Sequence, residues 1–303
     1  MAYKTSYFSN IKLLARVTTI WPHPEELYLG GNKVQVYMTL QHASLSLNLS
    51  VPMSVLMTED VSLSFLKRLE KKEVQAVLKR DWSLRPDKMI TPFTADPRAK
   101  LLQSNEEESK TWDTVQAWFL KPRWIIQPFI APLFHVGEVQ AFIINGFLFL
   151  KITTMPNSTT SDEIDITDMN EIRPLHLHKY DPQGQKPYTS LTGKNLGLTD
   201  FDDPNLSFES YVLRMLAKVI ILEEVKFKRK SGLRIFCRMD VSVYRNATTA
   251  KHEFFVNEIT RSHGACLFTK WDHSLKWRAA FNTFSQILHL AAKKKFYLSP
   301  PSL

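Results

Sequence analysis

The sequence has little glycine, with 9 residues in a chain of 303. It contains no GxxxxGK[ST] loop and no GxGxxG after an apolar strand, the two glycine-rich patterns that hold phosphate in P-loop and dinucleotide-binding folds. The patterns HExxH of zinc proteases and GxSxG of serine hydrolases are absent as well. The sequence therefore gives no support to a P-loop, a dinucleotide-binding, a zinc-protease or a serine-hydrolase site.

Cysteine and long apolar runs are also scarce. Cys237 and Cys266 form neither a disulfide framework nor a CxxC metal site, which is typical of a reduced cytosolic chain with buried thiols. No segment approaches the roughly 18 consecutive apolar residues of a membrane helix. Near the N-terminus Lys4, Lys12 and Arg16 occur without an acid, which leaves an amphipathic transit peptide open. We expect a cytoplasmic protein with no membrane partner.

The charge of the chain favours an anionic partner. Lys and Arg number 39 against 30 Asp and Glu, a net charge of +9. A nucleotide, an acidic metabolite, nucleic acid and an anionic membrane all satisfy that sign. The basic run from Lys226 to Lys230 is the only further support for nucleic acid, and it follows a predicted helix, where cations interact favourably with the C-terminal dipole. We therefore do not expect nucleic acid as the partner.

The patterning predicts an α+β fold with mostly antiparallel strands. An Asn145-Gly146 pair between two apolar runs is a strong hairpin signal. Residues 81–110 and 155–205 are polar or rich in turn formers, and we expect loops there. Apolar spacing predicts helices near 33–40, 62–73, 112–120, 208–222 and 277–293, and strands near 47–51, 74–78, 124–130, 139–144, 147–152, 233–244 and 253–260.

Two of the late strands carry acids. Arg238 and Asp240 share one face of the first strand, and Glu258 and Thr260 share one face of the second. If the strands pair, one base and two carboxylates converge among apolar neighbours, where ionised acids are costly unless they are neutralised. Hard oxygen ligands suit Mg²⁺, which typically takes one or two carboxylates and substrate phosphates. An ordinary ion pair at a strand end accounts for the same residues equally well.

Two further segments have the chemistry of a nucleotide site. Lys79 ends an apolar strand, where its ammonium could meet the phosphates of a nucleotide as a point charge, although a lone lysine at a strand end is usually only solvated. Gln127 and Phe129 flank Pro128 and could place backbone groups against an adenine edge, but Gln before Pro is also an ordinary ending of an edge strand.

Taken in order, these segments resemble the ATP-grasp superfamily, which includes glutathione-synthetase-like carboxylate–amine ligases. The resemblance runs from about Asn32 to Gly264. It comprises the pairs and runs Asn32-Lys33, Val51-Pro52-Met53-Ser54, Val77-Leu78-Lys79, Ile126-Gln127-Pro128-Phe129-Ile130, Gly137-Glu138, Arg238-Met239-Asp240 and Glu258-Ile259-Thr260. Two α+β subdomains sandwiching a nucleotide cleft are implied: an N-terminal extension or truncated region over 1–31, a small subdomain over 32–122 and a large one over 123–303.

The resemblance implies ATP and Mg²⁺ as cofactors. It assigns ATP binding to Lys79, Gln127, Phe129 and Glu138, metal binding to Asp240, Glu258, Asn257 and Thr260, and catalysis to Arg238. The implied activity is activation of an unknown carboxylate substrate as an acyl phosphate, which an amine or similar nucleophile then attacks.

The sequence also departs from the superfamily pattern. Gln140 stands where many members have arginine, Thr260 stands where asparagine is common, with Asn257 as a potential substitute, and Asp81 to Pro86 has none of the glycines of the usual phosphate flap. These departures leave a second interpretation open, a catalytically degenerate relative that binds a nucleotide or a protein.

Overall fold

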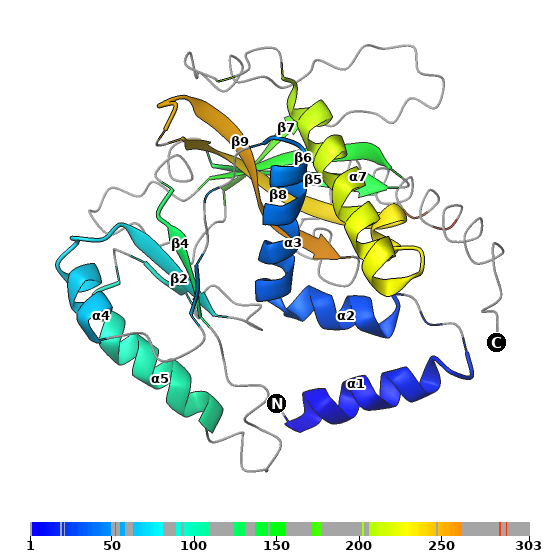
Figure 1. Ribbon diagram of the computed structural model, residues 1–303, viewed down its shortest axis with the longest axis horizontal. Coiled ribbons are helices and arrows are strands. Elements are labelled where there is room, and N and C mark those ends of the chain that lie inside the picture. The colour runs from blue at the N-terminus through cyan, green and yellow to red at the C-terminus, as the bar shows by residue number, and fades with distance from the viewer. Residues whose placement is uncertain are drawn as a thin grey trace. The chain divides into compact units, whose positions relative to one another are not determined.

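The structure, a computed structural model, describes residues 2–18, 20, 22–49, 52, 55–57, 63–80, 89–91, 94–109, 124–130, 137–144, 146–155, 171–176, 202, 206–246, 248–261, 285 and 289. The chain divides into two compact units, each with its own antiparallel sheet (Figure 1). Unit 1 comprises Met1–Gln41, Val51–Ala131 and Pro156–Asn170, and unit 2 comprises His42–Ser50, Pro132–Met155 and Glu171–Leu303. The α+β class and the mostly antiparallel strands predicted from the sequence are confirmed, while the subdomain limits at 31 and 122 stay predictions.

Unit 1 contains a four-stranded sheet in the order β1-β4-β2-β3. Its strands are β1 (Val55–Met57), β2 (Ala76–Arg80), β3 (Met89–Ile90) and β4 (Trp124–Pro128). Its helices are α1 (Ala2–Leu14), α2 (Pro24–Gly31), the first part of α3 (Lys33–Ser46), α4 (Leu63–Glu70) and α5 (Pro97–Ser109).

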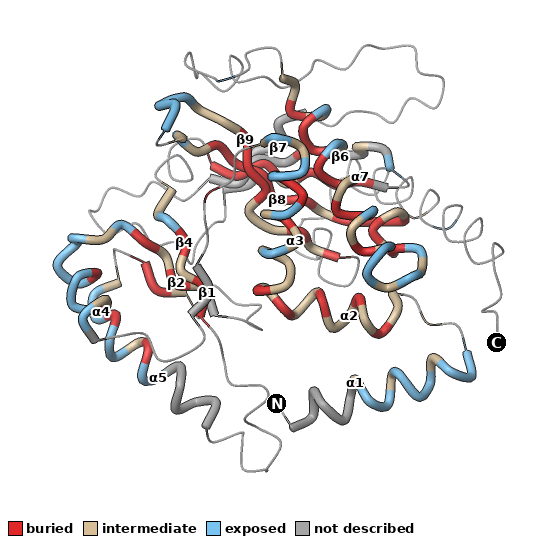
Figure 2. Tube along the Cα trace, in the orientation of Figure 1, coloured by how far each residue is buried: buried red, intermediate tan, exposed pale blue. Residues whose placement is uncertain are grey.

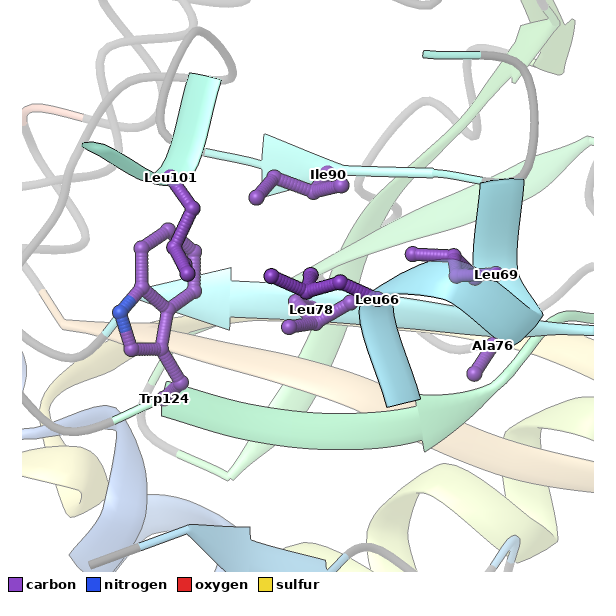
Figure 3. Close-up of a cluster of buried hydrophobic side chains, with 7 residues drawn as sticks. All are labelled: Leu66, Leu69, Ala76, Leu78, Ile90, Leu101 and Trp124. Atoms are coloured by element: carbon purple, nitrogen blue, oxygen red, sulfur yellow. The ribbon is translucent and has the colours of Figure 1, made fainter. Parts of the chain in front are cut away.

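One face of this sheet packs against α4 and α5 through an apolar cluster (Figure 3). The cluster consists of Leu66, Leu69, Ala76, Leu78, Ile90, Leu101 and Trp124. Side chains alternate along β2, so Val77 and Lys79 lie on the face of the sheet opposite the cluster.

Unit 2 contains a five-stranded sheet in the order β7-β6-β5-β8-β9, with every neighbouring pair antiparallel. The strands are β5 (Glu138–Ile144), β6 (Phe147–Met155), β7 (Glu171–His176), β8 (Phe236–Arg245) and β9 (His252–Arg261). The predicted hairpin is present, and Gly146 in its turn has φ +80°, a conformation that a side chain would strain. A 3₁₀ turn at Gly232–Arg234 precedes β8.

Helix α7 (Phe208–Phe227) covers one face of this sheet. Ser207 caps its N-terminus by accepting from the Ser210 N–H at 3.1 Å, and Lys228 ends it in the left-handed conformation. Phe208 and Tyr211 pack on Phe254 of β9, with ring centroids 5.8 and 5.5 Å apart. Figure 2 shows the resulting buried residues along α7 and β8.

Two ion pairs, one part-buried and one buried, connect α7 to the same face of the sheet. Glu209 contacts Lys151 of β6, and Glu223 contacts Arg261 of β9. Lys151 is the register partner of Ala141, and Arg261 is the register partner of Cys237. The side chains of Ala141 and Cys237 are fully buried. Because partners in an antiparallel pair share a face, the α7 face contains Ala141, Cys237, Lys151 and Arg261 together. The site residues described below lie on the other face.

The structure corrects one predicted strand and adds a helix. Residues 47–49 form no strand: Leu47 and Asn48 make a turn after α3, Asn48 has φ 53°, and the Leu49 N–H donates to the Ser44 carbonyl at 2.9 Å. The polar stretch 81–110 contains β3 and α5, where only loops were predicted. The predicted helix 112–120 lies outside the described residues, and of 277–293 only Ser285 and His289 are described, both helical.

Within the described part of the chain, no helix is both long enough and apolar enough to span a bilayer.

Candidate functional site

The central feature of unit 2 is the pairing of β8 with β9. Asp240 is the register partner of Glu258, and Arg238 is the register partner of Thr260. These four side chains therefore share the face of the sheet opposite α7. The predicted convergence of one base and two carboxylates on a sheet surface is present.

Arg238 and Asp240 form a two-pronged ion pair. Nε of Arg238 donates to Oδ1 of Asp240 at 2.7 Å, and Nη2 donates to Oδ2 at 2.7 Å. Nη2 also donates to the Thr260 hydroxyl at 3.2 Å. The side chains are 17% and 4% exposed, so the pair is screened little by water. The ordinary ion pair that the sequence left open is therefore a feature of this structure.

The electrostatic surroundings of Arg238 are acidic. Burial by itself lowers the pKa of the guanidinium, but Asp240, followed by Glu258 and Glu138, raises it above its ordinary value. Three carboxylates thus act on one cation.

A β-bulge brings a further polar residue to the same region. Asp240 pairs with Glu258 and the next residue, Val241, pairs with Val256, so Asn257 is the extra residue of β9. A bulge bends its strand and re-aims side chains. Nδ2 of Asn257 donates to Oε1 of Glu138 on β5 at 2.7 Å.

Strand β5 completes this face of unit 2. Gln140 is the register partner of Asp240, and Phe142 is the register partner of Arg238. Phe142 is fully buried and Gln140 is partly buried. Gln140 therefore lies beside Asp240 and adds no charge to the acids of this face.

The donor set fits Mg²⁺ in kind. Asp240, Glu258, Asn257 and Thr260 offer oxygen atoms, and a protein typically supplies one or two carboxylates to this ion beside substrate phosphates. Among the described residues no group of three or more His, Cys, Asp and Glu side chains is arranged to hold a metal. A magnesium site here therefore rests on the Asp240 and Glu258 carboxylates, and its assignment stays a prediction.

Unit 1 carries the other predicted nucleotide ligands. Lys79 of β2 pairs with Ile125 of β4, and Gln127 of β4 pairs with Val77, so Lys79 and Gln127 share the face opposite the apolar cluster. Gln127 is buried at 8% exposure. Phe129 follows the end of β4, and its N–H donates to the carbonyl of Gln75 at 2.9 Å.

The sequence reasoning missed Tyr37 of α3. Its hydroxyl accepts from Nζ of Lys79 at 3.0 Å and contacts Oε1 of Gln127 at 3.2 Å. The spacing of Val34, Tyr37, Met38 and Leu40 indicated only a helix. No pattern in the sequence around Tyr37 predicts its contact with Lys79, which lies 42 positions further along the chain.

Comparisons with known proteins address the fold. No protein-family model matches the sequence, and no curated protein sequence matches it either. Among solved structures, the D-cycloserine synthetase DcsG is similar with a TM-score of 0.53 at 10% identity, over 94% of this chain and 80% of that one.

Two other ligases match with lower scores. The D-alanine–D-alanine ligase from Bacillus anthracis, in complex with ATP, has a TM-score of 0.42 at 12% identity, over 85% of this chain and 64% of that one. The ATP-grasp ligase PsnB, with a minimal precursor, has a TM-score of 0.38 at 10% identity, over 80% of this chain and 55% of that one. This chain thus spans less than two thirds of the length of either ligase.

At these identities the likeness concerns the fold, and it agrees with the resemblance read from the order of motifs. The chain therefore has an α+β fold of the ATP-grasp type, similar to that of DcsG.

Proposed function

We propose that the protein binds ATP with Mg²⁺ and ligates a carboxylate to an amine or a similar nucleophile. The observation that carries this proposal is the acidic face of unit 2, where Asp240 and Glu258 are register partners and Arg238 bridges Asp240 to Thr260. Asp240 and Glu138 are buried and Glu258 is partly buried, and such carboxylates on one face suit a site that receives a divalent cation with a nucleotide.

In this proposal Asp240 and Glu258 hold the metal, with Asn257 and Thr260 as supporting oxygen donors. The ion would offset negative charge on the β- and γ-phosphates. Asn257 also orients Glu138 through the hydrogen bond of 2.7 Å, which prepares that carboxylate to accept from the nucleotide.

The remaining residues bind and orient the reactants. Lys79 contributes a positive charge to the α- and β-phosphates, and Gln127 and Phe129 supply groups for the adenine edge. The substrate carboxylate attacks the γ-phosphorus and ADP leaves, which gives an acyl phosphate. The nucleophile then attacks the acyl carbon and phosphate leaves. Arg238 stabilises the charge that develops on the transferred group.

A single-turnover experiment tests this function. Protein in excess over ATP is mixed with Mg²⁺ and pooled carboxylates and amines, and the release of ADP is followed against time. We expect ADP release that requires the carboxylate pool and is lost in a Glu258→Gln variant. ATP that stays intact with every pool, although it binds, would overturn the ligase activity.

Two observations favour a second function, a nucleotide- or protein-binding module without turnover. Gln140 adds no charge beside Asp240, and both carboxylate oxygens of Asp240 already accept from Arg238. In this second function the two-pronged pair stays closed and no phosphoryl group is transferred. ATP binding without ADP release in the same experiment is its expected result.

A further inference from the structure

Lys79, Tyr37 and Gln127 form a chain of hydrogen bonds within unit 1. Nζ of Lys79 donates to the Tyr37 hydroxyl at 3.0 Å, and the Tyr37 hydroxyl donates to Oε1 of Gln127 at 3.2 Å. The ammonium also lies 5.6 Å from the centroid of the Tyr37 ring, within the range of a cation–π contact. The three residues come from β2, α3 and β4, so one hydroxyl from a helix links two strands.

The direction of the chain follows from the chemistry of its groups. An ammonium has three N–H donors and no acceptor, so Tyr37 accepts from Lys79. The phenolic O–H is then directed at the Gln127 carbonyl oxygen. The hydrogen bond and the ring contact with Tyr37 hold the flexible stem of Lys79 in one conformation, and its ammonium keeps the positive charge that attracts phosphate.

We infer that Tyr37 is a positioning residue, which holds Lys79 and Gln127 ready for the triphosphate and the base of one nucleotide. This inference rests on the proposed ATP binding. A ligand group that is preorganised binds more tightly, because the side chain does not have to be ordered during binding. Tyr37 itself touches no reacting atom and acts through Lys79 and Gln127.

The first test needs no nucleotide. The protein is treated with a limiting amine-acetylating reagent, and the acetylation rate at each lysine is measured by mass spectrometry. In Tyr37→Phe the Lys79 amine loses the hydroxyl to which it donates, so we expect Lys79 to react several-fold faster than in the wild-type protein. Tyr28→Phe is the matched control, since Tyr28 of α2 packs edge-on against Phe8 with centroids 5.5 Å apart. An unchanged rate at Lys79 in Tyr37→Phe would overturn the inference.

The second test is a double-mutant cycle with Mg-ATP. We expect Tyr37→Phe to weaken Mg-ATP binding by about 5- to 30-fold, the range for loss of one or two hydrogen bonds. In a Lys79→Met background the same substitution should change affinity less than 3-fold, because the residue that Tyr37 positions is gone. An equal loss in both backgrounds would mean that Tyr37 acts on folding alone, and it would overturn the inference.

The outcomes separate this inference from the proposed function. If the wild-type protein binds no Mg-ATP, both are overturned, whatever the acetylation rates show. If it binds Mg-ATP and Tyr37→Phe binds equally well, this inference alone is overturned and the proposed function stands.

Discussion

Asp240 on β8 and Glu258 on β9 are register partners, while the next residue of β8 pairs with Val256. The single bulge between these pairs leaves Asn257 as the extra residue of β9, and its amide donates to Glu138 on the neighbouring strand β5. Through its bulged residue, β9 is thus hydrogen-bonded to Glu138 of β5, on the sheet face that also carries Asp240 of β8 and Glu258 of β9. Regular pairing through this segment would shift the partners by one residue, which turns a side chain to the opposite face.

The Arg238–Asp240 pair should be strongly coupled. Arg238→Met leaves Asp240, which is 3% exposed, without its bidentate partner. We expect the free energy of unfolding in urea to fall by about 3–5 kcal/mol, the usual cost of breaking a buried pair from one side. Adding Asp240→Asn to this variant should recover part of the loss, because the buried charge is then removed. Losses that simply add in the double variant would contradict the coupling.

Glu224 should make stability depend on pH in acid. The hydrogen bonds from Arg234 and, less strongly, from the Ser231 N–H lower the pKa of this carboxyl from 4.5 to about 2 against the effect of burial. Since the folded pKa lies below the unfolded one, the stabilisation is complete above about pH 4.5 to 5 and is lost as the pH falls toward 2.

We therefore expect Glu224→Gln to be less stable than wild type at pH 7, by about 0.5–1 kcal/mol because Arg234 is partly exposed. The difference should shrink between pH 5 and pH 3 in urea titrations. A difference that stays constant over this range would exclude Glu224 as its cause.

The apolar cluster of unit 1 should depend on Leu78, which is completely buried (Figure 3). Leu78→Ala removes a side chain from the interface with α4 and α5, and we expect a loss of about 2–5 kcal/mol in the free energy of unfolding. Val77→Ala is the neighbouring control, since Val77 is only partly buried and faces the other side of β2. Equal losses from the two substitutions would contradict the assignment of faces.

Cys237 should be chemically inert in the folded protein. Its side chain is fully buried, and burial raises the pKa of the thiol to about 12, although Arg261 opposes this shift. In a Cys266→Ala background we expect a thiol reagent at pH 8 to label Cys237 in urea and to leave it unlabelled in buffer. Rapid labelling in buffer would contradict the packing of β8 against α7.

The elements that could be predicted from the sequence have local signals. Alternation in β2 and β8, the Asn-Gly turn before β6 and the apolar spacing of α7 each depend on residues close in the chain. The apolar residues Leu47, Leu49 and Val51 gave the same alternation, but Asn48 adopts the left-handed conformation and its neighbours close the end of α3. Residues 97–109 were predicted as a loop because their mostly polar side chains give no helical apolar spacing, although a helix starts at Pro97.

The candidate site was predictable only in part. The spacing of two residues places Arg238 and Asp240 on one face of a strand, and this follows from the geometry of any strand. The bond of Asn257 to Glu138 and the contact of Tyr37 with Lys79 depend on partners 119 and 42 positions away in the chain. Such contacts are set by tertiary packing, so the sequence pattern did not contain them.

The central claim is that the acids of β8 and β9 bind a metal–nucleotide complex, and calorimetric titration with Mg-ATP tests it most directly. We expect the wild-type protein to bind Mg-ATP and Glu258→Gln to bind it at least about 10-fold more weakly while its circular dichroism stays unchanged. Glu253→Gln, at the far end of β9 beside Tyr244 and Asn246, should bind as the wild type does. Equal affinity of Glu258→Gln and wild type for Mg-ATP, or no binding by the wild type, would contradict the claim.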